Sequence, residues 1–462
     1  MKERSDYIFN HNSFYGIVGV AEETITPPAT IYLGNWGAAK EQTALGFHLP
    51  LTLTALTFQN LNREAPLVIV SMDLGWWKNP MDALNFRNRM LEELSLRPEE
   101  LMLCLSHTHA GPSICSGEVN KENGGDIVSF LNEVQDLAVR TVRNALLKGQ
   151  PSTLTWSYGK CSLAKNRDLP EVHGKRILTG FNPSIIADDT LLVGRITDEE
   201  NDIKAIVVNY ACHPTTLGWK NRLISSDYVG AMRSLVEKEI SAPCIFLQGA
   251  SGELAPAQQY TDEVRLAEKN GRQLGYSVLS TLEGMIAPGN KLCFDSIMES
   301  GAPLAVWKEQ AALKEVALSA QIVSVSYSLN KIKTAAEIET EYNRETDTVE
   351  KERLLRKLWI RKSLGDSDEA TVNLWIWRLG SSFLVAQPNE AYSDFQIQLR
   401  QHLPTEAIAV MNLVNGSYGY LPPSALYEQD IYQVWQTPFA KGSLELLIET
   451  CKEVLEKKLS EN

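Results

Sequence analysis

The sequence lacks three features that would assign it to a specialised class. No apolar run is long enough to cross a bilayer, so no transmembrane segment is expected. The net charge is −13 and the sequence has no cluster of basic residues. Both observations argue against a nucleic-acid partner, because phosphate binding needs clustered cations. No C-x-x-C pair occurs among seven scattered cysteines, so free thiols in a reducing compartment are expected in place of a disulfide framework.

The N-terminus has charged residues but no apolar segment of the kind found in a secretory signal. The sequence as it stands therefore favours a cytoplasmic protein, or a secreted or periplasmic one if a leader was removed. A length of 462 residues, with 44% hydrophobic and 22% charged residues, suits a large globular protein. No boundary rich in proline, glycine or serine divides it, so we expect one domain over residues 1–462.

Apolar runs with strand patterning alternate with segments of helical spacing. This pattern predicts a mixed α/β fold, with layered mixed β-sheets covered by helices. The clearest strands are expected at 66–74, 101–105, 153–164, 190–196, 203–212, 243–248, 371–379 and 382–386, and the clearest helices at 80–94, 127–147, 227–240, 262–285 and 443–459. Residues 306–365 differ in character, and we expect a charged, solvated helical insertion there that takes no part in catalysis.

Two histidines end the apolar run at 101–105, in the segment S-H-T-H-A-G-P. In extended chain, residues two apart point to the same side, so His107 and His109 are predicted to face one pocket. The alternative is a loop with two surface histidines.

A third histidine, His213, also ends an apolar strand, and Pro214 keeps it extended. Imidazoles at two strand ends favour a metal site, since imidazole suits zinc and similar ions. Two carboxylates hold comparable places: Glu390 ends another strand, and Asp73 is either a helix cap or a site residue. The small-residue loop from Gly249 to Pro256 offers backbone N–H groups to an anion, or is simply a tight turn.

Taken together, these segments resemble the neutral, non-lysosomal ceramidase family, a group of zinc-dependent amidases. The resemblance runs in order along nearly the whole chain. It rests on S-H-T-H-A-G-P (106–112), A-K-N-R (164–167), Y-A-C-H-P-T-T (210–216), L-I-S-S-D-Y-V-G (223–230), F-L-Q-G-A-S-G-E-L-A-P (246–256), Q-P-N-E (387–390) and N-G-S-Y-G-Y-L-P-P (415–423).

The resemblance implies a role for each matching residue. His107, His213 and Glu390 would be zinc ligands, with Tyr420, chosen over Tyr418, as the fourth. His109 would be the acid/base group, and Arg167 would contact the substrate or an oxyanion. The residues expected to contact the substrate are Asn166, Gly249 and Tyr432. Zinc with an open position would activate water for attack on an N-acyl amide.

The sequence also departs from the family. Ala255 stands where the family has a serine that is sometimes assigned as nucleophile, and Glu253 stands for an aspartate. A methyl group cannot attack, so a covalent serine mechanism at this position is excluded, whereas attack by metal-activated water is compatible. No C-terminal immunoglobulin-like domain is expected. Two alternatives stay open: a zinc hydrolase of another amide or an ester, and a non-catalytic binding protein.

Overall fold

Two β-sheets lie face to face at the centre of the molecule. The computed structural model describes residues 7–460. The larger sheet has the strand order β14-β12-β11-β7-β2-β4-β5-β6 and the smaller one β18-β19-β20-β22. Their bounds are β2 (Asn12–Thr24), β4 (Thr52–Gln59), β5 (Leu67–Met72), β6 (Leu101–Leu105), β7 (Gln150–Lys160), β11 (Thr190–Asp198), β12 (Ile203–Tyr210), β14 (Cys244–Gln248), β18 (Leu318–Ser328), β19 (Glu369–Leu379), β20 (Ser382–Ala386) and β22 (Ala407–Met411).

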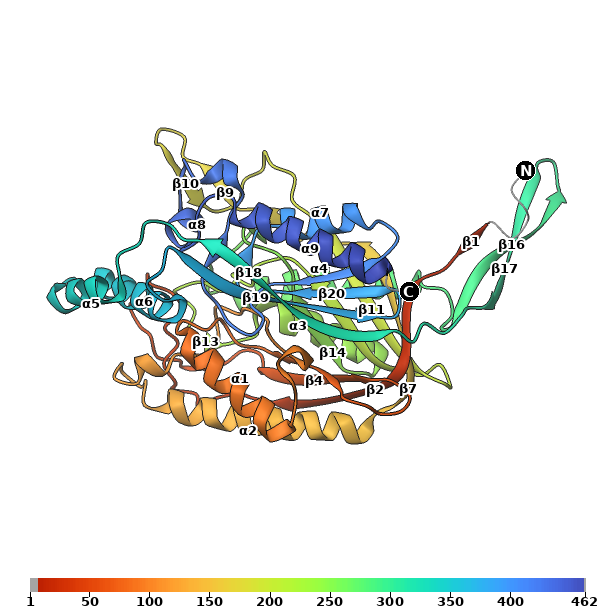
Figure 1. Cartoon of the computed structure of the whole chain (residues 1–462), viewed down its shortest axis with the longest axis horizontal. Helices are drawn as coiled ribbons and strands as arrows, with labels where there is room; N and C mark the ends of the chain where they lie inside the picture. The colour runs from red at the N-terminus through yellow and green to blue at the C-terminus, as the bar shows by residue number, and fades with distance from the viewer. Residues whose placement is uncertain (1–6, 461–462) are drawn as a thin grey trace.

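Helices cover the outer face of each sheet, which gives four layers (Figure 1). The larger sheet is covered by α1 (Pro80–Leu94), α2 (Asp126–Lys148), α3 (Asp227–Ile240) and α4 (Val264–Glu283), and the smaller sheet by α7 (Asp394–His402) and α9 (Ser443–Ser460). Helix α2 illustrates why: Phe130, Val134, Ala138 and Val142 recur every four residues and form one buried stripe. Side chains from both inner sheet faces, including Phe58, Trp156 and Trp377, fill the central layer.

Within the two central sheets, three strand pairs run parallel, and their carboxyl ends carry the predicted site. These pairs are β5 with β6, β12 with β14, and β20 with β22. Polar groups at the carboxyl ends of parallel strands are well placed to form a site, because no helix or sheet covers them there. The predicted mixed α/β fold with helix-covered sheets is therefore confirmed, and each helix named from the sequence begins and ends within two residues of its expected bounds.

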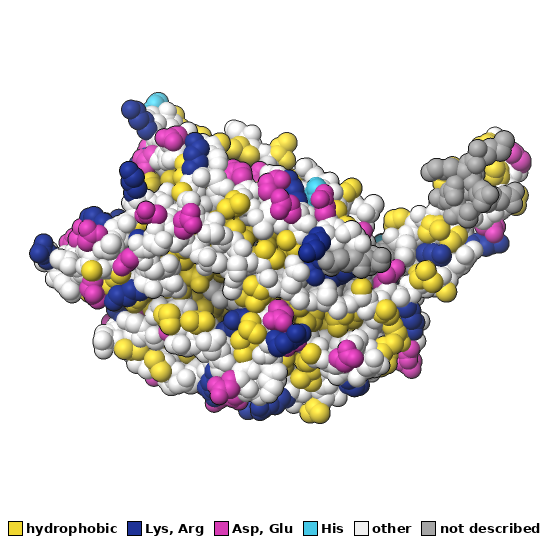
Figure 2. Space-filling model, in the orientation of Figure 1, with side chains coloured by type: hydrophobic (Ala, Val, Ile, Leu, Met, Phe, Trp, Pro, Cys, Tyr) yellow, Lys and Arg dark blue, Asp and Glu magenta, His cyan; other side chains and the backbone are white. Residues whose placement is uncertain are grey.

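The segment predicted to be a helical insertion is only partly helical. Residues 334–362 form the expected hairpin of α5 (Ala335–Arg344) and α6 (Thr348–Leu364), rich in charge at one end of the molecule (Figure 2). Before it, however, the chain forms β17 (Pro303–Ala311) and β18, so the helical prediction is wrong for these residues. Strand β17 pairs with β16 (Asn290–Glu299), and β1 (Ile8–Phe9) completes a three-stranded arm that projects from the opposite end (Figure 1).

The sequence also predicted that the chain has no transmembrane helix and no disulfide framework. Within residues 7–460, no helix has both the length and the hydrophobicity to span a membrane. All seven cysteines have free thiols, and Cys104, Cys212 and Cys244 are buried in the core as expected.

Candidate metal site and its cavity

Three side chains predicted as metal ligands meet at the carboxyl ends of the strands. His107 follows β6, His213 follows β12 and Glu390 follows β20, and all three are buried. Glu390 Oε2 lies 2.9 Å from His213 Nε2 and 3.4 Å from His107 Nε2. One potential ligand atom from each residue falls within 4.8 Å of the others. We call these three residues the strand-end cluster.

Backbone carbonyls hold both imidazoles with Nε2 turned inward. The Nδ1 atom of His107 lies 3.3 Å from the carbonyl oxygen of Gly75, and Nδ1 of His213 lies 3.1 Å from that of Leu254. A carbonyl only accepts, so each Nδ1 carries the proton and each Nε2 presents its lone pair to Glu390. Two lone pairs and a carboxylate facing one point form a site for a cation.

The strand-end cluster is compact enough to hold a metal ion. Two ligand atoms about 2.1 Å from a tetrahedral zinc ion lie about 3.4 Å apart, which is close to the observed spacings. Burial, followed by the charge of Arg167, lowers the pKa of His213 to about 3, so the ring is neutral, as a ligand must be. Glu390 contributes the carboxyl group of the cluster, and a metal ion would bind it in its ionised form.

The two histidines of the H-x-H segment converge, but for a different reason from the one predicted. The segment is not extended: His107 has a φ of 68°, in the left-handed region. Its backbone N–H donates to the carbonyl of Leu74, and that of His109 to the carbonyl of Pro214. These bonds hold the turn, and the two rings lie 4.8 Å apart between centroids. The alternative of two surface histidines is excluded for these residues.

A short pair of parallel strands places Tyr420 beside Glu390. Strands β21 (Glu390–Ala391) and β23 (Tyr420–Leu421) pair with Glu390 opposite Tyr420. The N–H of Glu390 donates to the carbonyl of Gly419, whose φ of 119° and closeness to Gln436 leave no space for a side chain. Tyr420 lines the cavity and Tyr418 does not. The role of Tyr420 as a fourth ligand stays a prediction, and the geometry favours Tyr420 over Tyr418.

Arg167 contacts both Tyr420 and His213. It follows β8 (Ala164–Asn166), which pairs with β15 (Leu254–Pro256). Its Nη2 donates to the carbonyl of Gly252 (2.8 Å) and to the hydroxyl of Tyr420 (3.1 Å), and lies 3.2 Å from His213 Nε2. Arg167 thus brings a fixed positive charge to the edge of the strand-end cluster.

His109 lies between two tryptophan rings. Its ring centroid is 5.0 Å from Trp36 and 4.7 Å from Trp76. Neither ring nitrogen has a hydrogen-bond partner among the residues that the structure describes. Burial, with the neighbouring His107 and His213, holds its pKa well below the usual value, so the ring is neutral. A neutral, unpartnered imidazole at a cavity wall is able to accept a proton.

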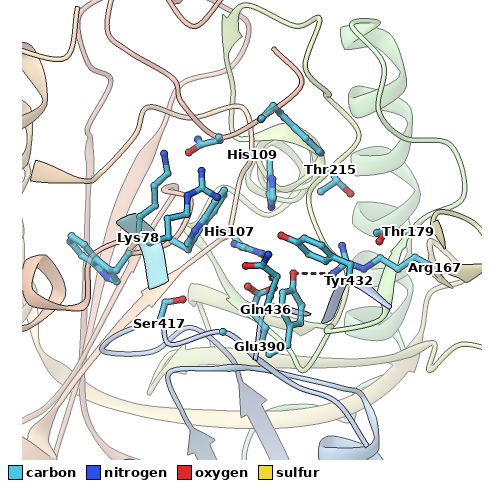
Figure 3. Close-up of a pocket in the computed structure, with 18 of the residues that line it drawn as sticks. Lys78, His107, His109, Arg167, Thr179, Thr215, Glu390, Ser417, Tyr432 and Gln436 are labelled. Atoms are coloured by element: carbon cyan, nitrogen blue, oxygen red, sulfur yellow. Dashed lines mark hydrogen bonds and ion pairs between the residues drawn. The ribbon is translucent and has the colours of Figure 1, made fainter. Parts of the chain in front are cut away.

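These groups open into one cavity of about 350 Å³ (Figure 3). His107, His109, Arg167 and Glu390 point into it from the strand ends, and Tyr432 faces them from α8 (Tyr432–Trp435) (Figure 3). The remaining lining residues come from loops and from the hairpin, and include Asn35, Trp36, Trp76, Lys78, Tyr260, Arg356, Ile360, Ser417 and Gln436.

Two residues predicted to contact the substrate lie outside the cavity lining. The Asn166 side chain accepts a hydrogen bond from the N–H of Asp168 (2.9 Å). The N–H of Gly249 donates to the carbonyl of Tyr210, and a Cβ at this glycine would lie 2.9 Å from Ala211. The loop from Gly249 is therefore a tight turn at its start, and its first N–H is not available to an anion. The contact of both residues with substrate stays a prediction.

Asp73, considered from the sequence, and His48 both have structural partners. Asp73 neither caps α1 nor lines the cavity: it forms a buried ion pair with Arg233 (2.6 Å), and Asn79 caps the helix. His48 lies near Ser225 (3.0 Å) and Glu268 (3.3 Å) and is not a lining residue.

The departures from the ceramidase pattern lie next to the site. Ala255 is buried in β15, opposite Lys165. Glu253 accepts hydrogen bonds from the N–H and hydroxyl of Ser393, and burial raises its pKa to about 8. Position 253 therefore holds a largely protonated carboxyl group near neutral pH.

The aromatic walls and the hairpin residues were missed from the sequence. Trp36 lies in a loop rich in glycine and alanine, and Trp76 lies in the loop after β5. Large aromatic residues in such loops were the available signal. The sequence around Arg356 and Ile360 carried no such signal, because its pattern predicts a solvated helix pair. One face of this pair reaches the cavity only because the hairpin packs against the rest of the molecule.

No family model matches the sequence. The structure is similar to a ceramidase solved in complex with C2, with a TM-score of 0.67 and 15% identity, over 97% of this chain and 76% of that chain. It is also similar to the neutral ceramidase from Pseudomonas aeruginosa, with a TM-score of 0.69 and 16% identity, over 97% of this chain and 75% of that chain. The resemblance noted in the sequence motifs thus extends to the fold, and this chain has the fold of the neutral ceramidases.

Proposed function

We propose that this protein is a zinc-dependent hydrolase of linear amides. The observation that carries the proposal is the strand-end cluster with both Nε2 atoms turned toward Glu390, beside an unpartnered His109. His107, His213 and Glu390 would hold the zinc ion, with Tyr420 as a fourth ligand. When bound there, zinc supplies a Lewis acid and lowers the pKa of water.

The surrounding side chains have complementary tasks in amide hydrolysis. His109 accepts the proton of the attacking water and later delivers a proton to the leaving nitrogen. Arg167 supplies fixed positive charge against the negative charge that develops on the carbonyl oxygen. Trp36 and Trp76 shield the ring of His109 from bulk water, which strengthens both interactions.

The fold supports an amide as substrate, and an N-acyl sphingoid is the first compound to test, since the similar solved structures are ceramidases. A smaller amide is the second candidate. The cavity of about 350 Å³ lies at the lower end of the range of ligand pockets, about 300–1,000 Å³, so a compact substrate fits within it.

The first test is metal content by elemental analysis, with the wild type beside His213→Ala. We expect about one zinc ion per chain in the wild type and its loss in the variant, together with loss of amide hydrolysis. His48→Ala is the matched control, because this imidazole also has buried partners but lies outside the cavity. Absence of metal from zinc-supplemented wild type, or equal metal in all three proteins, would contradict the proposal and favour a binding protein without turnover.

A further inference from the structure

The helical hairpin contributes one wall of the cavity. Arg356 and Ile360 of α6 are four residues apart, so they share one helix face, and both line the cavity. The hairpin is docked firmly: a Cβ at Gly117 would lie 2.3 Å from the ring of Trp359, which shows how closely that ring packs. We call Arg356 and Ile360 the hairpin wall.

The charges around the cavity are unbalanced. Among the described residues that line it, Lys78, Arg167 and Arg356 are cations and Glu390 is the one carboxylate. Lys78 is buried and pairs with Glu118 (3.0 Å), so its charge is neutralised within the protein. Glu390 belongs to the strand-end cluster, where a metal ion would add further positive charge. Arg356 also has a carboxylate partner, Glu352, which lies outside the cavity lining, and both side chains are partly exposed. An ion pair at a partly exposed position is weak, so Arg356 is able to bind a ligand with a negative group.

Arg356 is the cation with unused hydrogen-bonding capacity. Its Nη2 donates to Glu352 (2.5 Å), and both side chains are 30% exposed. Its Nε is shielded from solvent and has no hydrogen-bond partner among the described residues. By contrast, Arg167 donates to a carbonyl and to the Tyr420 hydroxyl. A guanidinium has five N–H donors, so the Nη groups of Arg356 keep donors for a ligand carboxylate beside the one that Glu352 accepts.

A second positive charge lies near Arg356. Burial lowers the pKa of Lys78, the Glu118 carboxylate opposes that shift, and the charge of Arg356 adds to it. Arg356 is therefore close enough to Lys78 to act on its charge, which Glu118 offsets.

We propose that Arg356 determines substrate specificity by binding a carboxylate at one end of the amide substrate. The inference rests on the proposed hydrolysis at the strand-end cluster. The rings of Trp36, Trp76 and Tyr260 line the cavity as apolar walls. The substrate class is then a compact N-acyl amino acid, whose apolar side chain contacts these rings while its carboxylate meets Arg356.

The test compares N-acetylphenylalanine with N-acetylphenethylamine, which has the same amide and ring but no carboxylate. We expect the wild-type kcat/KM to be about tenfold or more higher for the acid, as for a charge-assisted hydrogen bond. Arg356→Gln should bring the ratio close to one. Arg353→Gln is the matched control: it removes the same charge from an exposed residue of α6 outside the cavity lining, and should keep the wild-type ratio.

Binding of the two compounds to metal-free protein, followed by tryptophan fluorescence, separates this inference from the proposed hydrolysis. In the metal-free protein the ligand carboxylate has no metal to bind. Tighter binding of N-acetylphenylalanine in the wild type and Arg353→Gln, but not in Arg356→Gln, would therefore support carboxylate binding by Arg356 even if neither amide is hydrolysed. Equal binding of both compounds to the wild type, or the same preference in wild type and Arg356→Gln, would overturn it.

Discussion

The two sides of the cavity are built in opposite ways. The strand-end cluster rests on parallel strands at the centre of the fold, and backbone carbonyls orient its rings. The hairpin wall rests on one face of a charged helix pair that packs against the body from outside. The first arrangement fixes atoms to a fraction of an ångström, as chemistry requires. The second leaves sequence free to vary, which suits substrate selection.

The strongest test of this comparison is His109→Gln, beside the strand-end cluster. We expect kcat to fall about 10²–10⁴-fold, because the general acid/base is lost while the three metal ligands are intact. Metal content, measured on the same sample, should equal that of the wild type. A variant with unchanged kcat would remove His109 from the mechanism and leave the metal site unaffected.

A smaller effect is expected where the hairpin meets the body. In Gly117→Ala the added Cβ would displace the Trp359 ring and shift the hairpin wall. We expect KM to rise about fivefold, equivalent to about 1 kcal/mol, with kcat and metal content preserved. Gly125→Ala is the control, since a Cβ there meets no atom within 4 Å. If kcat falls as much as KM rises, the two sides of the cavity are not separable.

The smallest effect concerns stability under the strand-end cluster. Folding raises the pKa of Glu253 from 4.5 to about 8, so the folded protein retains a proton that the unfolded chain releases. The free energy of unfolding therefore falls as pH rises from about 4.5 to about 8. In Glu253→Gln this loss of stability with rising pH should be absent. The difference between the Tm of the variant and that of the wild type should therefore increase by about 2–4 °C from pH 5 to pH 9.

Thermal unfolding at both pH values checks the prediction. Glu237→Gln serves for comparison, because burial raises the pKa of Glu237 to about 7, a smaller shift away from the cavity lining. A parallel pH dependence in Glu253→Gln and wild type would mean that Glu253 is ionised in the folded protein.

The sequence predicted the strand-end cluster because its signal is local. Each of His107, His213 and Glu390 lies within a few residues of the end of an apolar run, so strand patterning and residue type are read from neighbouring positions. The turn at His107 was not predicted, since its positive φ depends on hydrogen bonds to distant segments. The strands within residues 306–328 were read as part of a helical insertion because the charge pattern of the hairpin dominated that segment.

The hairpin wall was not predicted because nothing near Arg356 in sequence marks it as a cavity residue. Its neighbours Arg353 and Glu352 form ordinary ion pairs within the same helix. Only docking against the Gly117 segment turns one face of α6 to the cavity. The charge and hydrophobic spacing of a segment predict its secondary structure, but they do not predict which other elements it packs against.

The pairing of β21 with β23 has a consequence for how this site can diverge. The main chain alone sets Glu390 opposite Tyr420, so neither side chain is needed to hold the other's position. Substitution at one of the two positions would leave the backbone of the other in place. Descendants of this sequence can therefore exchange one donor atom for another while inheriting the same scaffold.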